Sequence, residues 1–526
     1  MRQPVVIVIE APGKISSYRK VFSHSNVRII ATGGHFCRRE NDSLSDLGIS
    51  AGWQETGRLP EQYVVAQLTD KLSGATELII ATDPDQEGDV IARDIAAVAR
   101  GVATADLIIT RMRPFGLAAG CLHTAAINRE TWTDAHDRAA FAGDARRILD
   151  RLMGAAALSW GAGGLGRVST RLIASISARP LLPFRGTVVL PATDGRSPFI
   201  AHVDTKDEAQ FHKITALAKT VPVCGVAPHA ITARIKPYCY GEAVNAVSQR
   251  LEVETSEAAM LIQQAYEDGL LSYPRSSNRS LEPDALTFLR RLAKHHALPW
   301  NPERNLSVHG PSHTGHPAPA PIGAGAGLSL TRPLNVMPRT HAAVVIIARR
   351  LVECCSDFQQ GISQDFPAEL AGLHFTRPVI PLPWVHVPKE SSGKLRKREV
   401  VLIERMVENN IGRPSTQVGH AHKAVANDKI EVDYQVSEQS SIALNRLPLS
   451  WREAGLSDAI DNLVTPDNAD SPAELVEALL MLAGPETRNK AIELVAGTPA
   501  LSPVTEQLSR NIHNFRQSTV DRRIND

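Results

Sequence analysis

Tyr273 lies where a short apolar run gives way to a loop rich in serine and arginine. The run from Gly269 to Leu271 is expected to be strand-like, which would present the phenol at the exit of a strand. Arg275 follows two residues later and could reach the same phosphate as the phenol. Tyrosines at strand ends usually pack and form hydrogen bonds. From this stretch alone, Tyr273 is either a packing residue or a candidate nucleophile.

Glu10 and Lys14 follow an apolar run, Val5–Ile9, whose β-branched residues are typical of a strand buried on both faces of a parallel sheet. Residues 11–14 are expected to form a turn, and residues 15–22 have helical spacing. The two charged side chains would then lie at the carboxyl edge of the sheet and near a helix N-terminus, where α/β folds bind ligands. A plain strand-to-helix turn with incidental charges is the alternative.

Three carboxylates follow a second apolar run, residues 78–82, at alternate positions: Asp83, Asp85 and Glu87. Such a set suits Mg²⁺, which takes a few carboxylates, keeps waters and bridges to phosphate oxygens. An acidic surface turn before a helix over 90–98 is the alternative. Because acidic strand ends in one parallel sheet can face each other, Glu10 together with this cluster favours the metal site.

Basic side chains and glycines accompany the elements that come next. A strand predicted over 27–32 ends at Gly33-Gly34-His35, and a helix over 137–159 carries Arg146, Arg147 and Arg151. The helix face could simply be solvated. A glycine-rich loop at 161–166 then leads into Arg167 and Ser169 at a helix start, an arrangement that could hold a phosphate.

The composition sets broad limits. The 526 residues suggest roughly three or four domains, and 43% apolar with 21% charged residues is ordinary for a soluble globular protein. The 57 basic residues nearly match the 56 acidic ones, so the net charge of +1 gives no general argument for a polyanionic partner. The six cysteines include no CxxC pair, which argues against zinc ribbons and a disulfide framework. With no signal-like or membrane-spanning run, we expect a cytosolic protein with reduced thiols.

The second half of the chain is predicted to combine a β-containing lobe with helices. Short β-type runs occur at 186–190, 199–203 and 230–235, and β-like composition returns at 366–388. Helices are expected as a pair over 242–269 and singly over 339–355 and 400–409, with a basic linker at 389–399 that is either a solvated loop or a DNA-backbone contact. His309, His313 and His316 on a Pro/Ala/Gly-rich loop are a weak zinc candidate.

Three N-terminal segments resemble the signature segments of the Toprim domain as type IA DNA topoisomerases carry it. They are IEAPGK (9–14), ATGGH (31–35) and ATDPDQEG (81–88), in the family's order. Toprim domains also occur in primases and nucleases, so this resemblance alone leaves the activity open.

Later segments are similar to further type IA motifs. The helix with Arg147 resembles A-x-x-R-R-x-x-D-R-L-x-G, and the segment with Arg167 resembles S-x-G-R-V-Q-T/S. Residues 263–277 resemble the segment that ends in T-Y-x-R-T-D-S, whose catalytic tyrosine falls on Tyr273. His316 begins a segment similar to H-E-A-I-R-P, although the neighbouring His313 also lies close in sequence, and Arg413 lies in one similar to G-I-G-R-P-S-T. The matches extend from residue 5 to about residue 426.

The chain departs from the family pattern in several places. Ser276-Ser277-Asn278 stands for Thr-Asp-Ser, Pro317 and Ala320 replace a glutamate and an arginine, and Leu117 takes the place of an acid. The family's C-terminal zinc ribbons are also expected to be absent, since no CxxC pair exists. These departures suggest a lean core enzyme, closer to decatenation than to relaxation.

The resemblance implies a multidomain α/β and α+β fold: a Rossmann-like Toprim sheet followed by helical and β-containing lobes in a toroidal core. The expected domains are 1–130 (Toprim), 131–182 (first part of a helical DNA-binding domain), 183–240 with 366–388 (a β-containing hinge lobe), 241–365 (catalytic tyrosine) and 389–526 (second helical part plus tail).

The resemblance also implies an activity. Tyr273 would attack single-stranded or negatively supercoiled DNA, form a 5′-phosphotyrosine and allow strand passage and resealing without a nucleotide triphosphate. Arg275, Lys14, Glu10 and His316 would act at the scissile phosphate, with Mg²⁺ held by Glu10, Asp83, Asp85 and Glu87. Further DNA contacts are expected from His35, Arg147, Arg167, Ser169 and Arg413. The protein is expected to be a cytoplasmic monomer, associated with the nucleoid in a prokaryote; a Toprim nuclease or a non-enzymatic single-strand binding homologue is the alternative.

Overall fold

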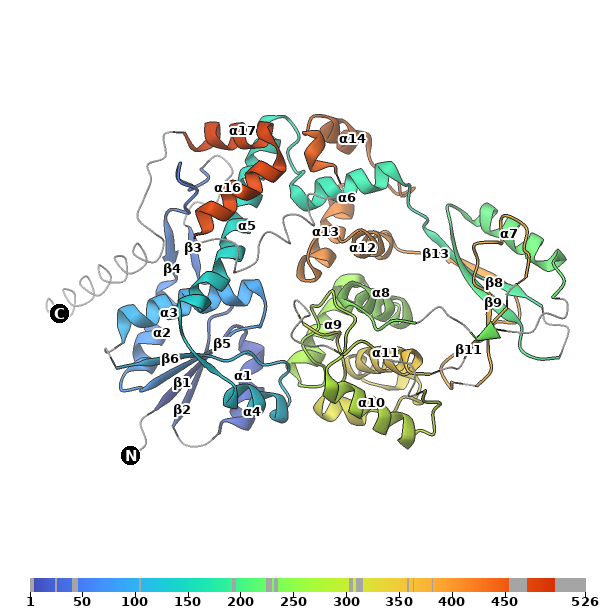
Figure 1. Cartoon of the computed structure of the whole chain (residues 1–526), viewed down its shortest axis with the longest axis horizontal. Helices are drawn as coiled ribbons and strands as arrows, with labels where there is room; N and C mark the ends of the chain where they lie inside the picture. The colour runs from blue at the N-terminus through green and yellow to red at the C-terminus, as the bar shows by residue number, and fades with distance from the viewer. Residues whose placement is uncertain are drawn as a thin grey trace. The chain divides into compact units, whose positions relative to one another are not determined.

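The computed structural model describes most of the chain: residues 4–23, 26–39, 46–103, 106–191, 195–223, 229–230, 235–301, 306–308, 316–356, 359–362, 364–380, 382–453 and 471–496. The chain divides into two compact units, one formed by Met1–Ala174 with Gln439–Asp526 and the other by Ser175–Glu438 (Figure 1). The finer five-domain division stays a prediction.

A mostly parallel sheet forms the centre of the first unit. Its strand order is β2-β1-β5-β6-β7, with β1 (Val5–Ile9) between β2 (Val27–Ala31) and β5 (Glu77–Ala81). β6 (Ile108–Arg111) continues the parallel pairing, and β7 (Glu130–Thr131) closes the edge in the antiparallel sense. The three strands predicted from apolar runs are thereby confirmed to within one residue at each end.

Helices cover this sheet because the strands are apolar on both faces. α2 (Gln62–Leu72) and α3 (Gln86–Val102) pack on one face, where Leu68 and Ile95 meet Val8 and Ile80 in a single buried core. The turn η1 (Pro12–Lys14) leads into α1 (Ile15–Val21), and α4 (Ala119–Ile127) packs against α1.

A long helix, α5 (Asp134–Ser159), joins the sheet to the C-terminal elements of the same unit. It begins three residues earlier than predicted, because Thr133 and His136 form a capping box at its start. α16 (Pro472–Ala483) and α17 (Pro485–Val495) pack on α5 (Figure 1). The Trp53 indole nitrogen donates to Glu477 at 2.8 Å, and the Trp160 and Trp451 rings lie edge to face.

Shorter elements complete the first unit. β3 (Cys37–Arg39) and β4 (Arg58–Pro60) form a small antiparallel pair, and η4 (Leu449–Trp451) carries Trp451. α6 (Arg167–Ala178) and α14 (Glu438–Asn445) contain the two points at which the chain passes between the units.

An antiparallel sheet lies at one end of the second unit. Its strand order is β10-β11-β12-β9-β8-β13, built around the long pair β8 (Phe184–Leu190) and β9 (Phe199–Thr205). α7 (Glu208–Thr220) packs on β8, where the Phe211 and Phe184 rings meet. The shorter strands are β10 (His229–Ala230), β11 (Gln359–Gly361), β12 (Thr376–Pro378) and β13 (Ser392–Leu395).

Two expectations for this sheet were wrong in part. The predicted linker at 389–399 contains β13, which pairs with β8 from Ser392↔Thr187 to Leu395↔Phe184. The β-like composition of 366–388 gives only the three-residue strand β12 among the described residues, since 368–372 form turns.

Helices form the rest of the second unit. The predicted pair is confirmed as α8 (Tyr240–Leu251) and α9 (Thr255–Glu267), and the predicted single helices are α11 (Arg339–Cys354) and α12 (Arg398–Glu408). α10 (Pro283–His295), α13 (Pro414–Ala426) and the short turns η2 (Gly323–Gly327) and η3 (Leu334–Val336) complete it. α11 is buried over most of its surface, and it contacts α8, α9 and α10.

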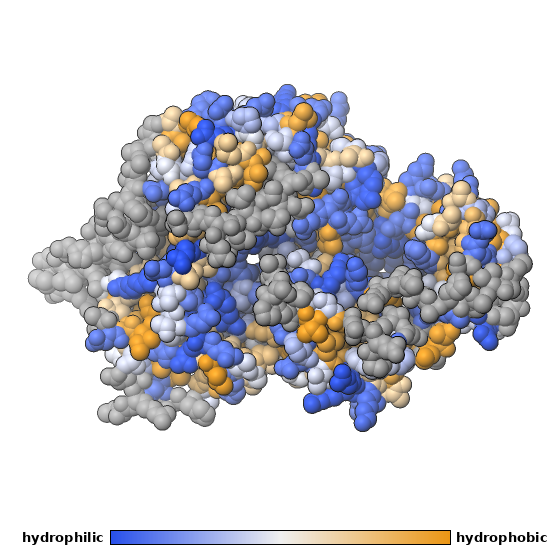
Figure 2. Space-filling model, in the orientation of Figure 1, coloured by the Kyte–Doolittle hydropathy of each residue, from blue (hydrophilic) through white to orange (hydrophobic). Residues whose placement is uncertain are grey.

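Within the described residues, every helix is too short or too polar to cross a membrane. Figure 2 shows hydrophilic residues interspersed with smaller hydrophobic groups on the visible face of the protein.

Candidate active site

Glu10 lies at the end of β1, on the carboxyl edge of the parallel sheet. Its backbone oxygen accepts hydrogen bonds from Gly33 (2.8 Å) and Gly34 (3.1 Å), which follow the neighbouring strand β2. Both glycines have positive φ, 78° and 101°, so the turn that closes over Glu10 favours residues without a side chain. On the other side, the Asp83 amide lies 3.4 Å from the Glu10 carboxylate. The predicted meeting of the two acidic strand ends is therefore present.

Lys14 is buried beside these acids, with 2% of its surface exposed. Its ammonium forms an ion pair with the Asp83 carboxylate, which is itself almost fully buried. The pair is placed by the turn η1, which brings Lys14 from the end of β1 back over the end of β5. A buried cation at this edge is suited to neutralising a phosphate that displaces part of its carboxylate contact.

Asp85 has a structural role in addition to its charge. It is the N-cap of α3, and its side chain accepts a hydrogen bond from the Gly88 amide at 2.8 Å. This cap explains why α3 starts at Gln86 and not at the predicted residue 90.

Gly88 is required by close packing. A β-carbon built on it would lie 1.9 Å from the Asp83 carbonyl oxygen, a backbone atom that cannot move without shifting the acidic turn. We expect Gly88→Ala to destabilise the protein by about 3 kcal/mol in urea unfolding, with loss of any binding at the acidic turn. Gly120→Ala in α4, where nothing lies within 4 Å of the added methyl, is the control and should be neutral or slightly stabilising. Equal effects of the two substitutions would contradict the steric argument.

The Glu10 carboxyl group has an unusually high pKa. Its pKa is raised from 4.5 to about 7, first by burial and then by the Asp83 carboxylate, with Asp85 adding to the rise and Lys14 opposing it. A carboxyl group that titrates near neutral pH can donate a proton to a leaving oxygen and later take it back.

A raised pKa in the folded state fixes the sign of a pH effect on stability. Folding favours the protonated form of Glu10. The contribution of this group to the free energy of unfolding is therefore complete below about pH 4.5 and is lost as the pH rises through about 7. We therefore expect Glu10→Gln to leave the urea midpoint unchanged at pH 5 and to raise it at pH 8.5, both in EDTA. A lower midpoint for the variant at pH 8.5 would contradict the raised pKa.

Arg111 is a residue at this edge that the sequence reasoning missed. Its side chain is 1% exposed and donates to the backbone oxygens of Thr82 (2.9 Å) and Asp83 (3.1 Å), and to the Asp89 carboxylate at 3.2 Å. It thereby holds the acidic turn in place at the end of β5. The sequence does carry a signal for this residue. Arg111 lies at the end of β6, the next parallel strand, and a charged side chain buried at the carboxyl edge of a sheet needs a partner there.

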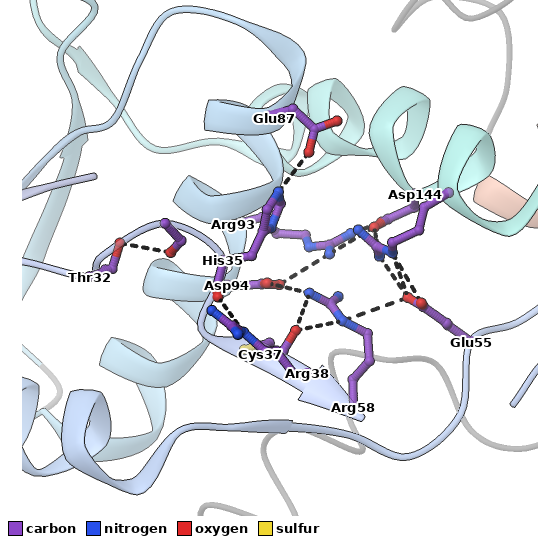
Figure 3. Close-up of polar contacts among 12 residues, drawn as sticks. Thr32, His35, Cys37, Arg38, Glu55, Arg58, Glu87, Arg93, Asp94 and Asp144 are labelled. Carbon is purple, nitrogen blue, oxygen red and sulfur yellow. Dashed lines mark hydrogen bonds and ion pairs between the residues drawn. The ribbon is translucent and has the colours of Figure 1, made fainter. Parts of the chain in front are cut away.

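His35 and Glu87 form a pair beside the acidic turn. The His35 Nε2 atom lies 2.6 Å from the Glu87 carboxylate, and Figure 3 shows the two side chains pointing toward each other. The hydrogen bond from His35 is the main reason that the pKa of Glu87 is lowered. His35 thus holds Glu87 in place. The other three predicted metal ligands, Glu10, Asp83 and Asp85, have different hydrogen-bond or ion-pair partners.

Next to this pair, α3, α5 and β4 are joined by a chain of alternating charges. Arg93 bridges Asp94 and Asp144, while Arg58 donates to Asp94 at 2.6 Å (Figure 3). Although burial opposes it, Arg93 and Arg147 hold the pKa of Asp144 well below its usual range. This network of paired charges links the three elements to one another.

Three of the predicted DNA contacts in the first unit have partners in the protein. Arg147 belongs to the charge network, with its guanidinium 2.6 Å from Glu55 and 2.7 Å from Asp144. Arg167 pairs with Asp150 at 2.8 Å, and the Ser169 hydroxyl accepts from the Gly166 amide at 2.9 Å. Their role toward DNA stays a prediction.

Tyr273 lies in the second unit and is 1% exposed. Its ring packs edge to face on two neighbours, with ring centres 5.0 Å from His316 and 5.6 Å from Tyr266. The predicted strand before it is reduced to isolated bridges at Leu271, which pairs with Pro321, and at Ser272, and the chain turns at Gly269 with φ of 70°. His316, one of the two predicted histidines, therefore lies against the Tyr273 ring, while His309 and His313 lie outside the described residues.

Arg275 and Arg413 are the other predicted site residues of the second unit. The Arg275 guanidinium forms a hydrogen bond with the Tyr240 phenol. The pKa of Tyr240 is raised by burial, and Arg275 opposes part of this rise. Tyr240 begins α8, and its amide donates to Ser276 at 2.9 Å, so Arg275 and the loop that carries Tyr273 are anchored to the same helix start. Arg413 is the N-cap residue of α13.

The chemistry of the donors at the carboxyl edge of the parallel sheet suits Mg²⁺. Glu10, Asp83 and Asp85 interact closely enough for each of the two aspartates to raise the Glu10 pKa, and all three offer the hard oxygen ligands that Mg²⁺ prefers. In the described part of the chain, no three His, Cys, Asp or Glu side chains are already gathered around one metal-sized point. Mg²⁺ keeps several of its waters, so carboxylates that are not gathered around one point suit it through bridging waters.

The comparisons with known proteins agree with this architecture. The family model of the Toprim domain matches residues 5–112. Full-length topoisomerase I from Thermotoga maritima is a similar solved structure: the match covers 98% of this chain and 90% of that chain, with a TM-score of 0.54 and 18% sequence identity. No curated protein matches the chain. The chain thus carries a Toprim domain in its first unit, and its fold is that of a type IA topoisomerase.

Proposed function

We propose that the protein is a type IA DNA topoisomerase that cuts and reseals one strand of DNA through a covalent bond to Tyr273. The observation that carries the proposal is the Tyr273 phenol ring packed against the His316 ring, with Arg275 two residues further on. The type IA fold and the acidic Toprim edge support it.

In the forward step, the Tyr273 oxygen attacks the phosphorus of a single-stranded segment and the 3′ oxygen of the preceding sugar leaves. The phenol loses its proton, and the leaving oxygen gains one from Glu10, whose pKa of about 7 suits this exchange. The products are a 5′-phosphotyrosine and a free 3′-hydroxyl. After strand passage, the 3′-hydroxyl attacks the same phosphorus and the phenolate leaves. The phosphodiester bond is conserved throughout, so no nucleotide triphosphate is needed.

The transition state carries extra negative charge on the phosphate oxygens, and cations are needed to stabilise it. We assign this role to Lys14 and Arg275, with His316 as a hydrogen-bond donor to the scissile phosphate. Each of these side chains is held in place: Lys14 by Asp83, Arg275 by Tyr240, and His316 by its contact with Tyr273.

Glu10, Asp83 and Asp85 are the residues that would hold Mg²⁺, with Glu87 contributing from its position beside His35. When bound, Mg²⁺ supplies positive charge that neutralises phosphate oxygens and aligns the DNA ends. A thermal-shift series tests the site without DNA. Mg²⁺ is expected to raise the melting temperature of the wild type at pH 8 by several degrees, and to raise that of Asp83→Asn much less.

The remaining basic and polar residues, His35, Arg147, Arg167, Ser169 and Arg413, are assigned to the DNA backbone. Arg147 and Arg167 would exchange their carboxylate partners for phosphates. We further propose that the protein acts as a monomer in the cytoplasm on single-stranded or negatively supercoiled DNA, and favours decatenation over relaxation.

Covalent trapping tests the proposed function. The protein is incubated with Mg²⁺ and an oligonucleotide labelled at its 3′ end, the reaction is stopped with denaturant, and the labelled protein is digested and analysed by mass spectrometry. We expect the label on the peptide that contains Tyr273. Free unligated ends without a protein adduct would instead indicate a Toprim nuclease, and retention of intact DNA without cleavage would indicate a binding protein.

A further inference from the structure

An extended segment, residues 316–322, runs beside the loop that carries Tyr273. Its sequence alternates His-Pro-Ala-Pro-Ala-Pro-Ile, so every second residue lacks a backbone N–H. Three N–H groups within the segment donate to the Tyr273 loop: Ala318 to Ser280 at 2.7 Å, Ala320 to the Ser272 hydroxyl at 2.9 Å, and Ile322 to Leu270 at 3.0 Å. The prolines alternate with these donors, so they occupy positions whose backbone is not required to donate to the Tyr273 loop.

At the His316 end of the segment, the contact is made by side chains. The His316 carbonyl oxygen accepts a hydrogen bond from the Ser276 hydroxyl and a second from the Asn278 side-chain amide, the latter at 2.9 Å. The Asn278 backbone amide in turn donates to the Ser276 hydroxyl at 3.0 Å, which orients it. Ser276 is 3% exposed, while Asn278 and His316 are half-buried, so the contacts are partly shielded from water.

These contacts act on the catalytic pair through one residue. The carbonyl that they fix belongs to His316, and the ring of that residue lies 5.0 Å from the Tyr273 ring at an interplanar angle of 75°. With the carbonyl held by two donors, the His316 backbone is fixed beside the Tyr273 loop, and this sets the point from which its ring reaches the phenol.

We propose that Ser276 and Asn278 are positioning residues that hold His316 against Tyr273. They occupy the places where the sequence departs from the type IA pattern, and Ser277, which stands in the place of the missing acid, is exposed. Two neutral donors to one carbonyl thus take over the positioning of this loop. The inference rests on the proposed function for its catalytic consequence, but the positions of the side chains do not.

Loss of the Ser276 hydroxyl removes one donor from the half-buried His316 carbonyl and releases the orienting contact to Asn278. We expect Ser276→Ala to slow cleavage by about tenfold and Asn278→Ala by a similar factor, the equivalent of one buried hydrogen bond each. Oligonucleotide binding should stay unchanged, because neither side chain is assigned to DNA. Ser276→Thr keeps the hydroxyl and should restore the cleavage rate to within about twofold of the wild type.

The experiment compares these variants with the wild type and with Ser277→Ala, an exposed serine next to the site and hence a matched control. Single-turnover cleavage of a labelled oligonucleotide gives the rate, and fluorescence anisotropy gives the dissociation constant. In parallel, ¹³C-histidine NMR follows the Cε1–H resonance of His316, identified by its loss in His316→Gln. We expect the ring-current shift from Tyr273 to shrink in Ser276→Ala and to persist in Ser276→Thr and Ser277→Ala.

The outcomes separate the positioning role from the proposed function. A wild type that forms no covalent adduct would overturn the function, and the NMR shift alone would then decide whether Ser276 positions His316. An active wild type with an unchanged cleavage rate and an unchanged His316 resonance in Ser276→Ala would overturn the positioning role. Failure of Ser276→Thr to rescue, or a matching loss of oligonucleotide affinity in Ser276→Ala, would do the same.

Discussion

Tyr273→Phe is expected to abolish the covalent DNA adduct and to lower strand cleavage by at least about three orders of magnitude. The variant lacks the attacking oxygen, and the described residues around Tyr273 supply no second hydroxyl at the same point of the fold. Because only one buried oxygen is lost and the ring is kept, the change in the free energy of unfolding should stay within about 1–2 kcal/mol. Adduct formation on a denaturing gel and urea unfolding together measure both effects.

Tyr266→Phe is the matched control for this prediction. Tyr266 is also buried and packs edge to face on the Tyr273 ring, 5.6 Å away between ring centres, so removal of its hydroxyl perturbs the same surroundings. We expect this variant to keep the adduct. If the adduct persisted in Tyr273→Phe and disappeared in Tyr266→Phe, the nucleophile would have been assigned to the wrong tyrosine.

Lys14→Met is expected to have the second largest effect, on activity and on stability together. The substitution leaves the buried Asp83 carboxylate without its cation, beside Glu10 and Asp85. Loss of one partner of a buried ion pair costs about 3–5 kcal/mol. Because the pKa of Glu10 is raised to about 7, Glu10 is neutral at pH 5 and adds its negative charge beside Asp83 at pH 8.5, so the loss of stability should be largest at pH 8.5 and clearly smaller at pH 5. Cleavage should fall by at least about a hundredfold, since a transition-state cation is removed.

Urea unfolding of Lys14→Met at the two pH values, in EDTA, measures the stability effect. Lys20→Met, an exposed lysine on the neighbouring helix α1, is the control and should change the midpoint little at either pH. A loss of stability that is the same at both pH values would show that the lysine contributes through packing of its alkyl chain and not through the charge.

The parallel sheet could be predicted from the sequence because its strands are continuous apolar runs. Strands buried on both faces need such runs, and the turn residues after them mark their ends. The meeting of Glu10 with Asp83 followed from the same rule, since the ends of neighbouring parallel strands share an edge. The start of α3 was missed by four residues, because Asp85 was interpreted as a metal ligand or as part of an acidic turn and not as a helix cap.

β13 could not be predicted from its side chains. All four residues, Ser392–Leu395, are exposed, and the strand is formed through its backbone pairing with β8. An edge strand of this kind has no hydrophobic pattern, so its sequence is the same as that of a solvated linker. The region 366–388 shows the opposite case. It is rich in residues with β propensity, yet its described part contains only the short strand β12, because a strand also needs a neighbouring strand to pair with.

At the site, residue types were predictable and their partners were not. Tyr273 and His316 were both singled out, but their distance in sequence gives no information on the ring contact between them. Arg111 and the charge network through Arg93 and Asp144 join residues tens of positions apart, and single charged residues on helices and strands carry no mark of a buried partner.

The packing of α16 and α17 on α5 has a consequence for how the protein is made. A ribosome releases the first 174 residues, including the whole parallel sheet, long before residues 472–495 emerge. Until then, α16 and α17 cannot cover α5, and the hydrogen bond from Trp53 to Glu477 cannot form. The first unit can therefore complete its packing only after the whole second unit has been synthesised.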